Sequence, residues 1–372
     1  MRFSAQHDVE MLFFSLEKHF HLSTGRSCHR YITDTREPGV ALNIGKASVM
    51  SWDCSAVLAE SSEGSATTPF ASHTSRAEAA QSLKMMKAIV EDRLQSLLLT
   101  NAFVPASLSR AMSHALMGGG KRFRPLFFIS MIRDPSKQDA AIDIGCAIEM
   151  VHTASLILDD LPCMDNADLR RQQVTTHKAF GEATAILAAI SLLMRGINII
   201  STVEGVEPQL RARLMEIISS AIGYEGLAGG QELDLNGGFG QDNIADVEQK
   251  NWLKTGALFG ATAEMAGLLD NKPEEQRIAL KAFAGHIGSA FQTMDDYLDT
   301  TGAASVLGKD TGKDVGKSTM ASRLGPAEAR SAYLEHLRLA YGLLPHCGIR
   351  EEEADVMLKS VFQIMPIEAA SA

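Results

Sequence analysis

From about residue 75 onward, apolar side chains recur every three or four positions. In the first such stretch they include Met86, Ile89, Val90 and Leu94, which would form one stripe along a helix. Glycine-rich segments separate the later periodic stretches, as is typical of loops between helices. No strand-like alternation of useful length is found. The pattern therefore predicts an all-α fold, built as one large helical bundle.

Residues 1–74 have a different pattern, rich in Ser, Thr and Ala with a short apolar patch around residues 11–14. Such a composition predicts a poorly structured extension, followed by an all-α domain over residues 75–372. Acidic residues such as Asp8, Glu10 and Glu17 are atypical of a transit peptide. We expect that deleting this extension leaves activity in place.

Composition and charge exclude several classes of protein. The chain has 372 residues, 45% of them hydrophobic, and a formal net charge of −10, which argues against a dedicated nucleic-acid binder. Its five cysteines are widely spaced without a CxxC motif, so we expect no disulfide framework and a reducing, cytoplasmic compartment. No run of 18 uninterrupted apolar residues occurs, so we expect no membrane span.

The first candidate site is an acidic cluster at the end of an apolar stretch. Asp159, Asp160 and Asp165 lie within seven residues, and Arg170 and Arg171 follow. Three carboxylates this close repel one another, so a cation should lie between them, and the adjacent guanidiniums could serve. Because Asp165 would rotate away on a continuous helix, Pro162 predicts that the helix ends here and that Asp165 folds back. Open carboxylates of this kind suit Mg²⁺, with substrate phosphates completing its ligands.

A second acidic cluster lies about 135 residues later. Asp295, Asp296 and Asp299 are three and four positions apart, so a helix would present all three on one face. A single cluster of this type is more often a solvated helix face. Two such clusters, each flanked by apolar helix, indicate a shared metal site.

Basic residues near glycines are candidates for binding phosphate. Lys121 and Arg124 follow Gly118-Gly119-Gly120, and their side chains could grip a diphosphate. His152 is two helical turns before Asp159 and is a further candidate, although a buried core histidine remains the alternative. Lys254 and Lys309 could add anion contacts. The segment around residues 308–318 fails as a P-loop because no strand leads into it and the glycine spacing is wrong. Glu149 and His152 form half of a di-iron motif whose second half is missing.

Taken in order, these motifs resemble those of the trans-isoprenyl diphosphate synthases, most closely the geranylgeranyl diphosphate synthases of bacterial carotenoid pathways. The resemblance covers about residues 75–365. It rests on GGGKRFRP at 118–125, DDLPCMD at 159–165 with Arg170-Arg171, GQELD at 230–234, Lys254-Thr255-Gly256, and Phe291-Gln292 before DDYLD at 295–299.

The resemblance implies a bundle of the isoprenoid-synthase type around a central active-site cavity, usually in a homodimer. It implies Mg²⁺ as cofactor, typically three ions, with Mn²⁺ as a substitute, held by Asp159, Asp160, Asp165, Asp295, Asp296 and Asp299. Isopentenyl diphosphate would be held by Lys121, Arg124, His152 and Arg171. The allylic diphosphate would be held by Arg170, Lys254 and Lys309. Thr255, Gln292 and Asp234 would support the carbocation and the metals.

Two small residues bear on the length of the product. In the family the growing tail runs beneath the first acidic cluster, and here the fifth and fourth residues before Asp159 are Ala154 and Ser155. Because neither is bulky, we expect farnesyl diphosphate to be extended to geranylgeranyl diphosphate. A farnesyl diphosphate synthase and a non-catalytic regulatory subunit are the alternatives. A terpene cyclase would not need the GGGKRFRP segment, and a phytoene or squalene synthase would space its acidic motifs differently.

Overall fold

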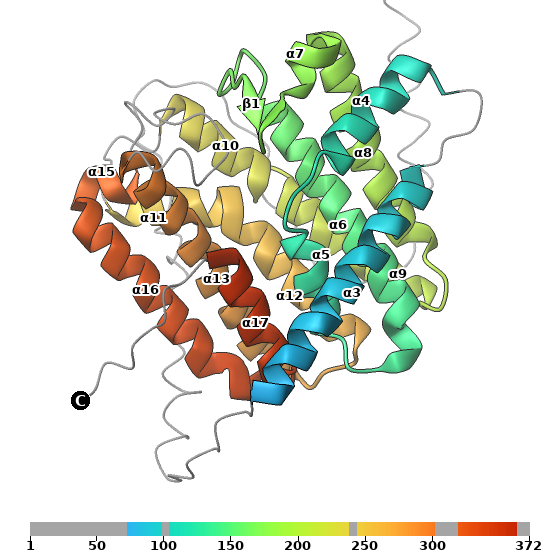
Figure 1. The fold of residues 1–372 in the computed structure, drawn as a ribbon, viewed down its shortest axis with the longest axis vertical. Helices are drawn as coiled ribbons and strands as arrows, with labels where there is room; N and C mark the ends of the chain where they lie inside the picture. Colours follow the sequence, from blue (N-terminus) through green and yellow to red (C-terminus); the bar gives the residue numbers. More distant parts are fainter. Residues whose placement is uncertain (1–72, 99–103, 238–243, 302–318, 363–372) are drawn as a thin grey trace, which may run out of the picture. The chain divides into compact units, whose positions relative to one another are not determined.

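The computed structural model describes residues 73–98, 104–237, 244–301 and 319–362, all of which fall in one contact unit, Trp52–Ala372. The all-α prediction is confirmed (Figure 1). Lys309 and the extension at residues 1–72 lie outside the described residues, so the boundary expected near residue 74 stays a prediction. The helices are α3 (His73–Leu98), α4 (Ala106–Met117), α5 (Phe123–Ser130), α6 (Gln138–Asp159), α7 (Thr176–Phe180), α8 (Glu182–Thr202), α9 (Pro208–Ile222), α10 (Leu227–Asn236), α11 (Ile244–Asn251), α12 (Ala257–Leu269), α13 (Glu274–Thr301), α15 (Met320–Leu324), α16 (Pro326–Leu343) and α17 (Glu351–Phe362), with short helical turns η2 (Pro135–Lys137), η3 (Trp252–Gly256) and η4 (Leu344–His346).

The core contains a cluster of phenylalanines where α5, α12 and α13 meet. Phe127 lies 5.5 Å from Phe123 and 5.8 Å from both Phe259 and Phe283, measured between ring centroids. All four rings are buried, and aromatic pairs at such distances contribute about 0.5–1.5 kcal/mol each beyond their burial. The phenylalanine cluster therefore fixes the helices that carry the basic and the second acidic motifs.

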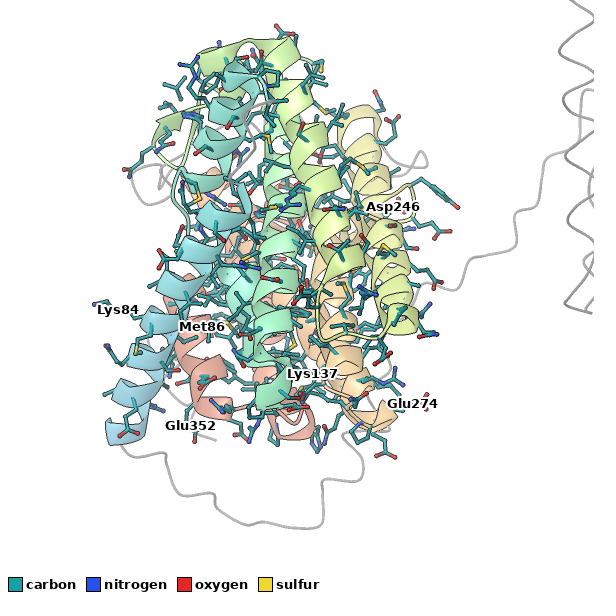
Figure 2. All side chains as sticks on the ribbon, turned by 90° about the vertical axis from the view of Figure 1, so that its right-hand side faces the viewer. Lys84, Met86, Lys137, Asp246, Glu274 and Glu352 are labelled. Carbon is teal, nitrogen blue, oxygen red and sulfur yellow. The ribbon has the colours of Figure 1, made fainter. Side chains whose placement is uncertain are left out.

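Charged side chains such as Lys84, Lys137 and Glu352 lie on the outside of the bundle (Figure 2).

Helices α6 and α8 approach closely because small residues line their contact. A Cβ atom built on Gly196 would lie 2.9 Å from the carbonyl oxygen of Ala147 and 3.1 Å from a methyl group of Val151. Ala188 and Ala189 on α8 are also buried. The close approach holds α6, whose last residue is Asp159, firmly against the bundle.

A two-stranded antiparallel hairpin, β1 (Leu169–Arg170) and β2 (Gln173–Val174), follows the first acidic cluster. This hairpin was not predicted from the sequence, and with two residues in each strand it leaves the all-α class unchanged. The turn residues Arg171 and Gln172 have φ angles of 53° and 65°, the left-handed conformation that two-residue hairpin turns of type I′ require. Because neither residue is glycine or asparagine, the sequence carries no ordinary signal for this turn.

Two helices, Pro135–Asp159 and Glu182–Thr202, are long and apolar enough to cross a membrane by length and composition. The first is mostly buried in the bundle, as core helices of bundles are, and the second is more exposed. Since composition does not separate these cases, the absence of a membrane span stays a prediction.

Candidate active site

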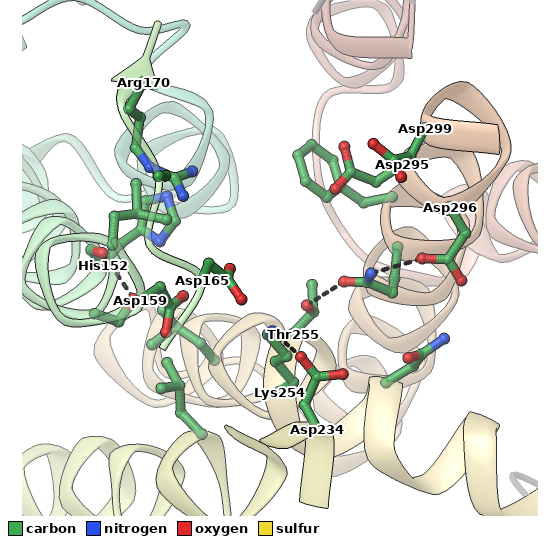
Figure 3. Close-up of a pocket in the computed structure, with 18 of the residues that line it drawn as sticks. His152, Asp159, Asp165, Arg170, Asp234, Lys254, Thr255, Asp295, Asp296 and Asp299 are labelled. Carbon is green, nitrogen blue, oxygen red and sulfur yellow. Dashed lines mark hydrogen bonds and ion pairs between the residues drawn. The ribbon is translucent and has the colours of Figure 1, made fainter. Parts of the chain in front are cut away.

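A cavity of about 270 Å³ brings together residues from motifs far apart in the chain (Figure 3). Its walls come from the end of α6, the hairpin, α10, η3 and α13. The predicted site residues that line it are Arg124, His152, Ser155, Asp159, Asp165, Arg170, Arg171, Asp234, Lys254, Thr255, Gln292, Asp295, Asp296 and Asp299.

The first acidic wall forms where α6 ends at Asp159, as the sequence predicted. The chain then folds back, since the backbone N–H of Asp165 donates to the carbonyl oxygen of Asp159 at 2.9 Å. Both carboxylates line the cavity. Burial raises the pKa of Asp159 to about 6, although Lys254 and Arg170 act against that rise. A desolvated carboxylate with a raised pKa would be stabilised as an anion by an added cation.

Asp160 is oriented differently from its neighbours. Its Oδ1 accepts a hydrogen bond from Nε of Arg170 at 2.7 Å and forms an ion pair with Nη2 of the same residue at 2.7 Å, and its side chain is almost fully buried. Asp160 lines a smaller pocket beside the cavity, whereas Arg170 lines both. Its metal-binding role stays a prediction, and the structure gives it a clear second one, which is to orient Arg170.

The second acidic wall is continuous helix, as predicted. Asp295, Asp296 and Asp299 on α13 all line the cavity. Asp296 accepts from Nε2 of Gln292 at 2.9 Å and from the backbone N–H of Met320 at 3.1 Å. The hydroxyl of Thr255 in turn donates to Oε1 of Gln292 at 2.8 Å. This chain of bonds fixes the side-chain amide of Gln292 at the cavity wall.

Between the two walls lies a partly buried cluster of one carboxylate and two lysines. Asp234 on α10 accepts from Nζ of Lys254 at 2.6 Å and from Nζ of Lys250 at 3.0 Å. Burial alone would lower the pKa of Lys254, but Asp234 and Asp159 outweigh it and raise that pKa, so the lysine stays charged. Lys254 lies in η3, a π-helical turn, a feature that is frequent at functional sites. Gly230 allows α10 to lie against this turn, because a Cβ atom at residue 230 would clash with the backbone nitrogen of Lys254.

The part of the cavity lined by Arg124, His152 and Arg171 is its cationic end, and His152 lies on the same side of the pocket as Asp159 (Figure 3). The Arg124 guanidinium lies over the ring of Phe259, 4.8 Å from its centroid, and Nη1 is 3.0 Å from Nε2 of His152. Since an arginine can only donate, His152 accepts through Nε2. Burial and the nearby Arg124 hold the pKa of His152 well below its usual value, so the imidazole is neutral. Arg171 donates from Nη1 to the carbonyl oxygen of Gly119 at 2.8 Å.

The cations at this end lack carboxylate partners. Burial lowers the pKa of Arg124 to about 10 and also lowers that of Arg171, yet both remain charged near neutral pH. Among the described residues, no carboxylate forms an ion pair with either guanidinium, and Nε of Arg124 is buried without a hydrogen-bond partner. Buried charge without a partner is costly, so this end of the cavity favours an anionic ligand.

Three remaining predictions have different outcomes. Lys121 does not line the cavity, since its Nζ donates to the carbonyl oxygen of Val361 on α17 at 2.8 Å. Lys309 lies outside the described residues. Ser155 lines the cavity, but Ala154 is buried in the core behind it. Their predicted roles are not tested by these positions.

Several residues of the site were missed from the sequence. Lys250 shares the face of Lys254, and its position four residues earlier was an available signal. Arg122 lies inside the basic motif, and the structure shows its guanidinium fully buried between Glu91 and Glu149. Nothing in the local pattern distinguishes Arg122 from Arg124, and Glu91 is far away in the sequence.

The cavity residues fit magnesium as a bridging ion. Hard carboxylate oxygens on two walls are the ligand type that Mg²⁺ prefers. Within the described residues, no three Asp, Glu, His or Cys side chains are close enough to enclose a metal by themselves. An ion here would need water or phosphate oxygens to complete its shell, which is how Mg²⁺ commonly binds with phosphorylated substrates.

Comparisons with known proteins agree with this geometry. The polyprenyl synthetase family model matches residues 105–326. A geranylgeranyl diphosphate synthase of Pseudescherichia vulneris is 40% identical over 258 residues, covering 68% of this chain and 83% of that protein. A farnesyl diphosphate synthase of Bacillus subtilis is 38% identical over 254 residues, covering 67% and 86%. Among solved structures, a Helicobacter pylori geranyltransferase complexed with magnesium and isoprenyl diphosphate has a TM-score of 0.70 at 28% identity, covering 80% of this chain and 100% of that one.

Proposed function

This chain belongs to the polyprenyl synthetase family and is a prenyltransferase of the trans-isoprenyl diphosphate synthase type, and from that premise we propose that it condenses isopentenyl diphosphate with farnesyl diphosphate to give geranylgeranyl diphosphate. One observation carries the proposal: a single cavity is lined both by two carboxylate walls and by Arg124 and Arg171, which have no carboxylate partner among the described residues. These ends suit two diphosphates that are held in different ways.

At the acidic end, Asp159, Asp165, Asp295, Asp296 and Asp299 would hold magnesium, with manganese as a substitute. When bound, the metal would neutralise the allylic diphosphate and stabilise its charge as the carbon–oxygen bond breaks. The magnesium in the Helicobacter pylori complex supports this assignment. Lys254 and Arg170 are the cationic side chains beside these carboxylates, and they would contact the same diphosphate.

At the cationic end, Arg124, His152 and Arg171 would bind isopentenyl diphosphate directly. Arg124 and Arg171 supply charge-assisted hydrogen bonds, and neutral His152 keeps the Arg124 fork oriented. The double bond of isopentenyl diphosphate would then attack the allylic carbocation, and the proton it loses would pass to the departing diphosphate.

Two residues with neutral oxygen atoms, Thr255 and Gln292, line another part of the cavity wall. The hydroxyl of Thr255 and Oε1 of Gln292, joined at 2.8 Å, present dipoles that would stabilise positive charge without capturing it. Thr255, Gln292 and the ring of Phe291 all line this part of the cavity. No covalent bond to a side chain is needed in this reaction.

Twenty carbons is the proposed product length, because small Ser155 lines the cavity and small Ala154 lies behind it. The relatives include both geranylgeranyl and farnesyl diphosphate synthases, so a fifteen-carbon product is the second candidate. Synthesis of carotenoid precursors in the cytoplasm is the setting we propose.

A homodimer is part of the proposal. Four large apolar side chains are exposed on α8, namely Ile186, Leu187, Ile190 and Met194. Their spacing places them along one side of the helix, and a second copy of the chain would cover them. Light scattering of the purified protein tests this, and a monomer at micromolar concentration would contradict it.

The function is tested by incubating purified protein with Mg²⁺, labelled isopentenyl diphosphate and farnesyl diphosphate. We expect a labelled twenty-carbon diphosphate as the main product, identified by chromatography after dephosphorylation. Elongation of geranyl diphosphate to fifteen carbons and no further would favour the farnesyl diphosphate synthase. No elongation with any allylic primer would favour a regulatory subunit.

A further inference from the structure

Arg122 is a fully buried arginine that the proposed reaction does not use. Its Nε and Nη2 donate to the two carboxylate oxygens of Glu91 at 2.8 and 3.0 Å, and its Nη1 donates to Glu149 at 3.2 Å. The paired geometry with Glu91 is the strong, fork-shaped kind of ion pair. Buried ion pairs often add little net stability, so the placement of this one suggests another role.

The backbone at Arg122 has an unusual conformation. Its φ of 52° lies in the left-handed region, which is unfavourable for a residue other than glycine. The residue is the N-cap of α5 and sits between Lys121 and Arg124. Its side-chain bonds to Glu91 and Glu149 hold the chain in this turn, and the turn sets the direction in which α5 presents Arg124.

The glycines before Arg122 are tied down as well. Lys87 donates from Nζ to the carbonyl oxygen of Gly120 at 3.0 Å, and Arg171 donates to that of Gly119 at 2.8 Å. Lys87 and Glu91 both belong to α3, which precedes the segment that the family model matches. One helix outside that segment therefore holds the basic loop, residues 118–124, at two points.

Glu149 connects this arrangement to the cavity electrostatically. It is almost fully buried and bonds to Arg122, and its charge favours the charged forms of both Arg124 and Arg171. Glu149 therefore stabilises the charged forms of the two cavity arginines from a distance. Because Glu149 forms its ion pair with Arg122, it leaves the Arg124 guanidinium available to a ligand.

We propose that Glu91, Arg122 and Glu149 form a positioning triad that holds the basic loop so that Arg124 meets the diphosphate of isopentenyl diphosphate, which makes α3 a working part of that binding site. None of the three lines the cavity. The inference rests on the proposed function, since the ligand of the cationic end is taken from it.

A matched control exists on α3 and α6, the helices that carry Glu91 and Glu149. Arg93 of α3 donates to both oxygens of Asp143 on α6 at 2.6 and 2.9 Å, with fork geometry like that of Arg122 and Glu91. This pair lies outside the basic loop and the cavity. Breaking it removes an α3–α6 tie without touching the turn at Arg122.

The test compares Glu91→Gln with Asp143→Asn, using calorimetric binding of isopentenyl diphosphate and steady-state kinetics. Glu91 is 30% exposed at its side chain, so its loss should leave the fold intact, which the melting temperature checks. Groups that support binding residues typically contribute about 10–100-fold. We expect Glu91→Gln to weaken isopentenyl diphosphate binding by about 10-fold and to change the KM of the allylic substrate by less than about twofold. Asp143→Asn should change both quantities by less than about twofold.

Arg122→Lys provides a second reading, because it keeps the charge and loses the fork, and it should weaken binding of isopentenyl diphosphate as well. Unchanged binding in Glu91→Gln, or equal losses in Glu91→Gln and Asp143→Asn, would overturn the triad. If the wild-type protein binds isopentenyl diphosphate but the two variants do not differ, only this inference is refuted. If the wild-type protein neither binds nor elongates isopentenyl diphosphate, the proposed function is refuted.

Discussion

The two ends of the cavity are built on different principles. At the cationic end, Arg124 and His152 are held by each other and by Phe259, so its side chains are already in place. At the acidic end, Asp159 of α6 and the carboxylates of α13 line the same space, and burial keeps the pKa of Asp159 raised although Lys254 and Arg170 act against that rise. From this difference we propose that the cationic end is preformed for its anion and that the acidic end is completed by metal and substrate together.

The largest effect should follow from removing one carboxylate of the acidic end. Asp295→Asn keeps the size of the side chain and removes its charge, so we expect kcat to fall by about 10²–10³, the usual cost of one charge-stabilising group. Binding of isopentenyl diphosphate should change little. Asp168→Asn, which breaks an exposed pair with Lys178, is the control. If Asp295→Asn weakened isopentenyl diphosphate binding as much as it lowered kcat, that result would contradict the division between the two ends.

The cationic end is tested by Arg124→Met. Truncating one partner of a buried charged contact costs about 2–5 kcal/mol, so the KM for isopentenyl diphosphate should rise by roughly 30-fold or more. The allylic KM should stay within about twofold. The KM of Arg124→Lys for isopentenyl diphosphate should lie between those of the wild type and Arg124→Met, since lysine keeps the charge without the fork-shaped guanidinium. A rise in both KM values would show that the ends are not separate.

A change behind the cavity should affect neither end. Ala154→Phe adds bulk at a buried position, and overpacking of this kind costs about 1–3 kcal/mol of stability. We expect shorter products, with fifteen carbons dominating, and KM values for isopentenyl diphosphate near those of the wild type. Chromatography of the products measures this. An unchanged product length would refute the role given to Ala154.

The smallest expected effect concerns how α13, which carries the second acidic wall, is held. Nδ1 of His286 lies 3.1 Å from Nδ1 of His336 on α16, and burial lowers both pKa values, that of His336 to about 4. A histidine whose pKa is lowered in the folded state contributes stability above pH 6.5 that is lost as the pH falls toward 4. His336→Gln should therefore lose less stability than the wild type over that range, by on the order of 1 kcal/mol in denaturant titrations. Parallel losses in the two proteins would contradict it.

How far the sequence predicts the site depends on the kind of feature. The face shared by Asp295, Asp296 and Asp299 follows from helical spacing alone, and Pro162 correctly marked the end of α6. The sequence offered the adjacent guanidiniums as a counter-charge for the first acidic cluster, but it did not specify the pairing of Asp160 with Arg170, because that pairing depends on a hairpin whose turn residues lack the usual glycine. Glu91 escaped for a related reason: its partner Arg122 is 31 positions away, and no local pattern links the two.

The most direct test of the account is equilibrium binding of each substrate with and without metal. In EDTA, isopentenyl diphosphate should bind the wild-type protein, and Arg124→Met should abolish that binding. A non-reactive thio analogue of farnesyl diphosphate should bind tightly only when Mg²⁺ is present. Metal-independent binding of the farnesyl analogue, or a strict metal requirement for isopentenyl diphosphate, would contradict the division of the cavity into a preformed cationic end and a metal-completed acidic end.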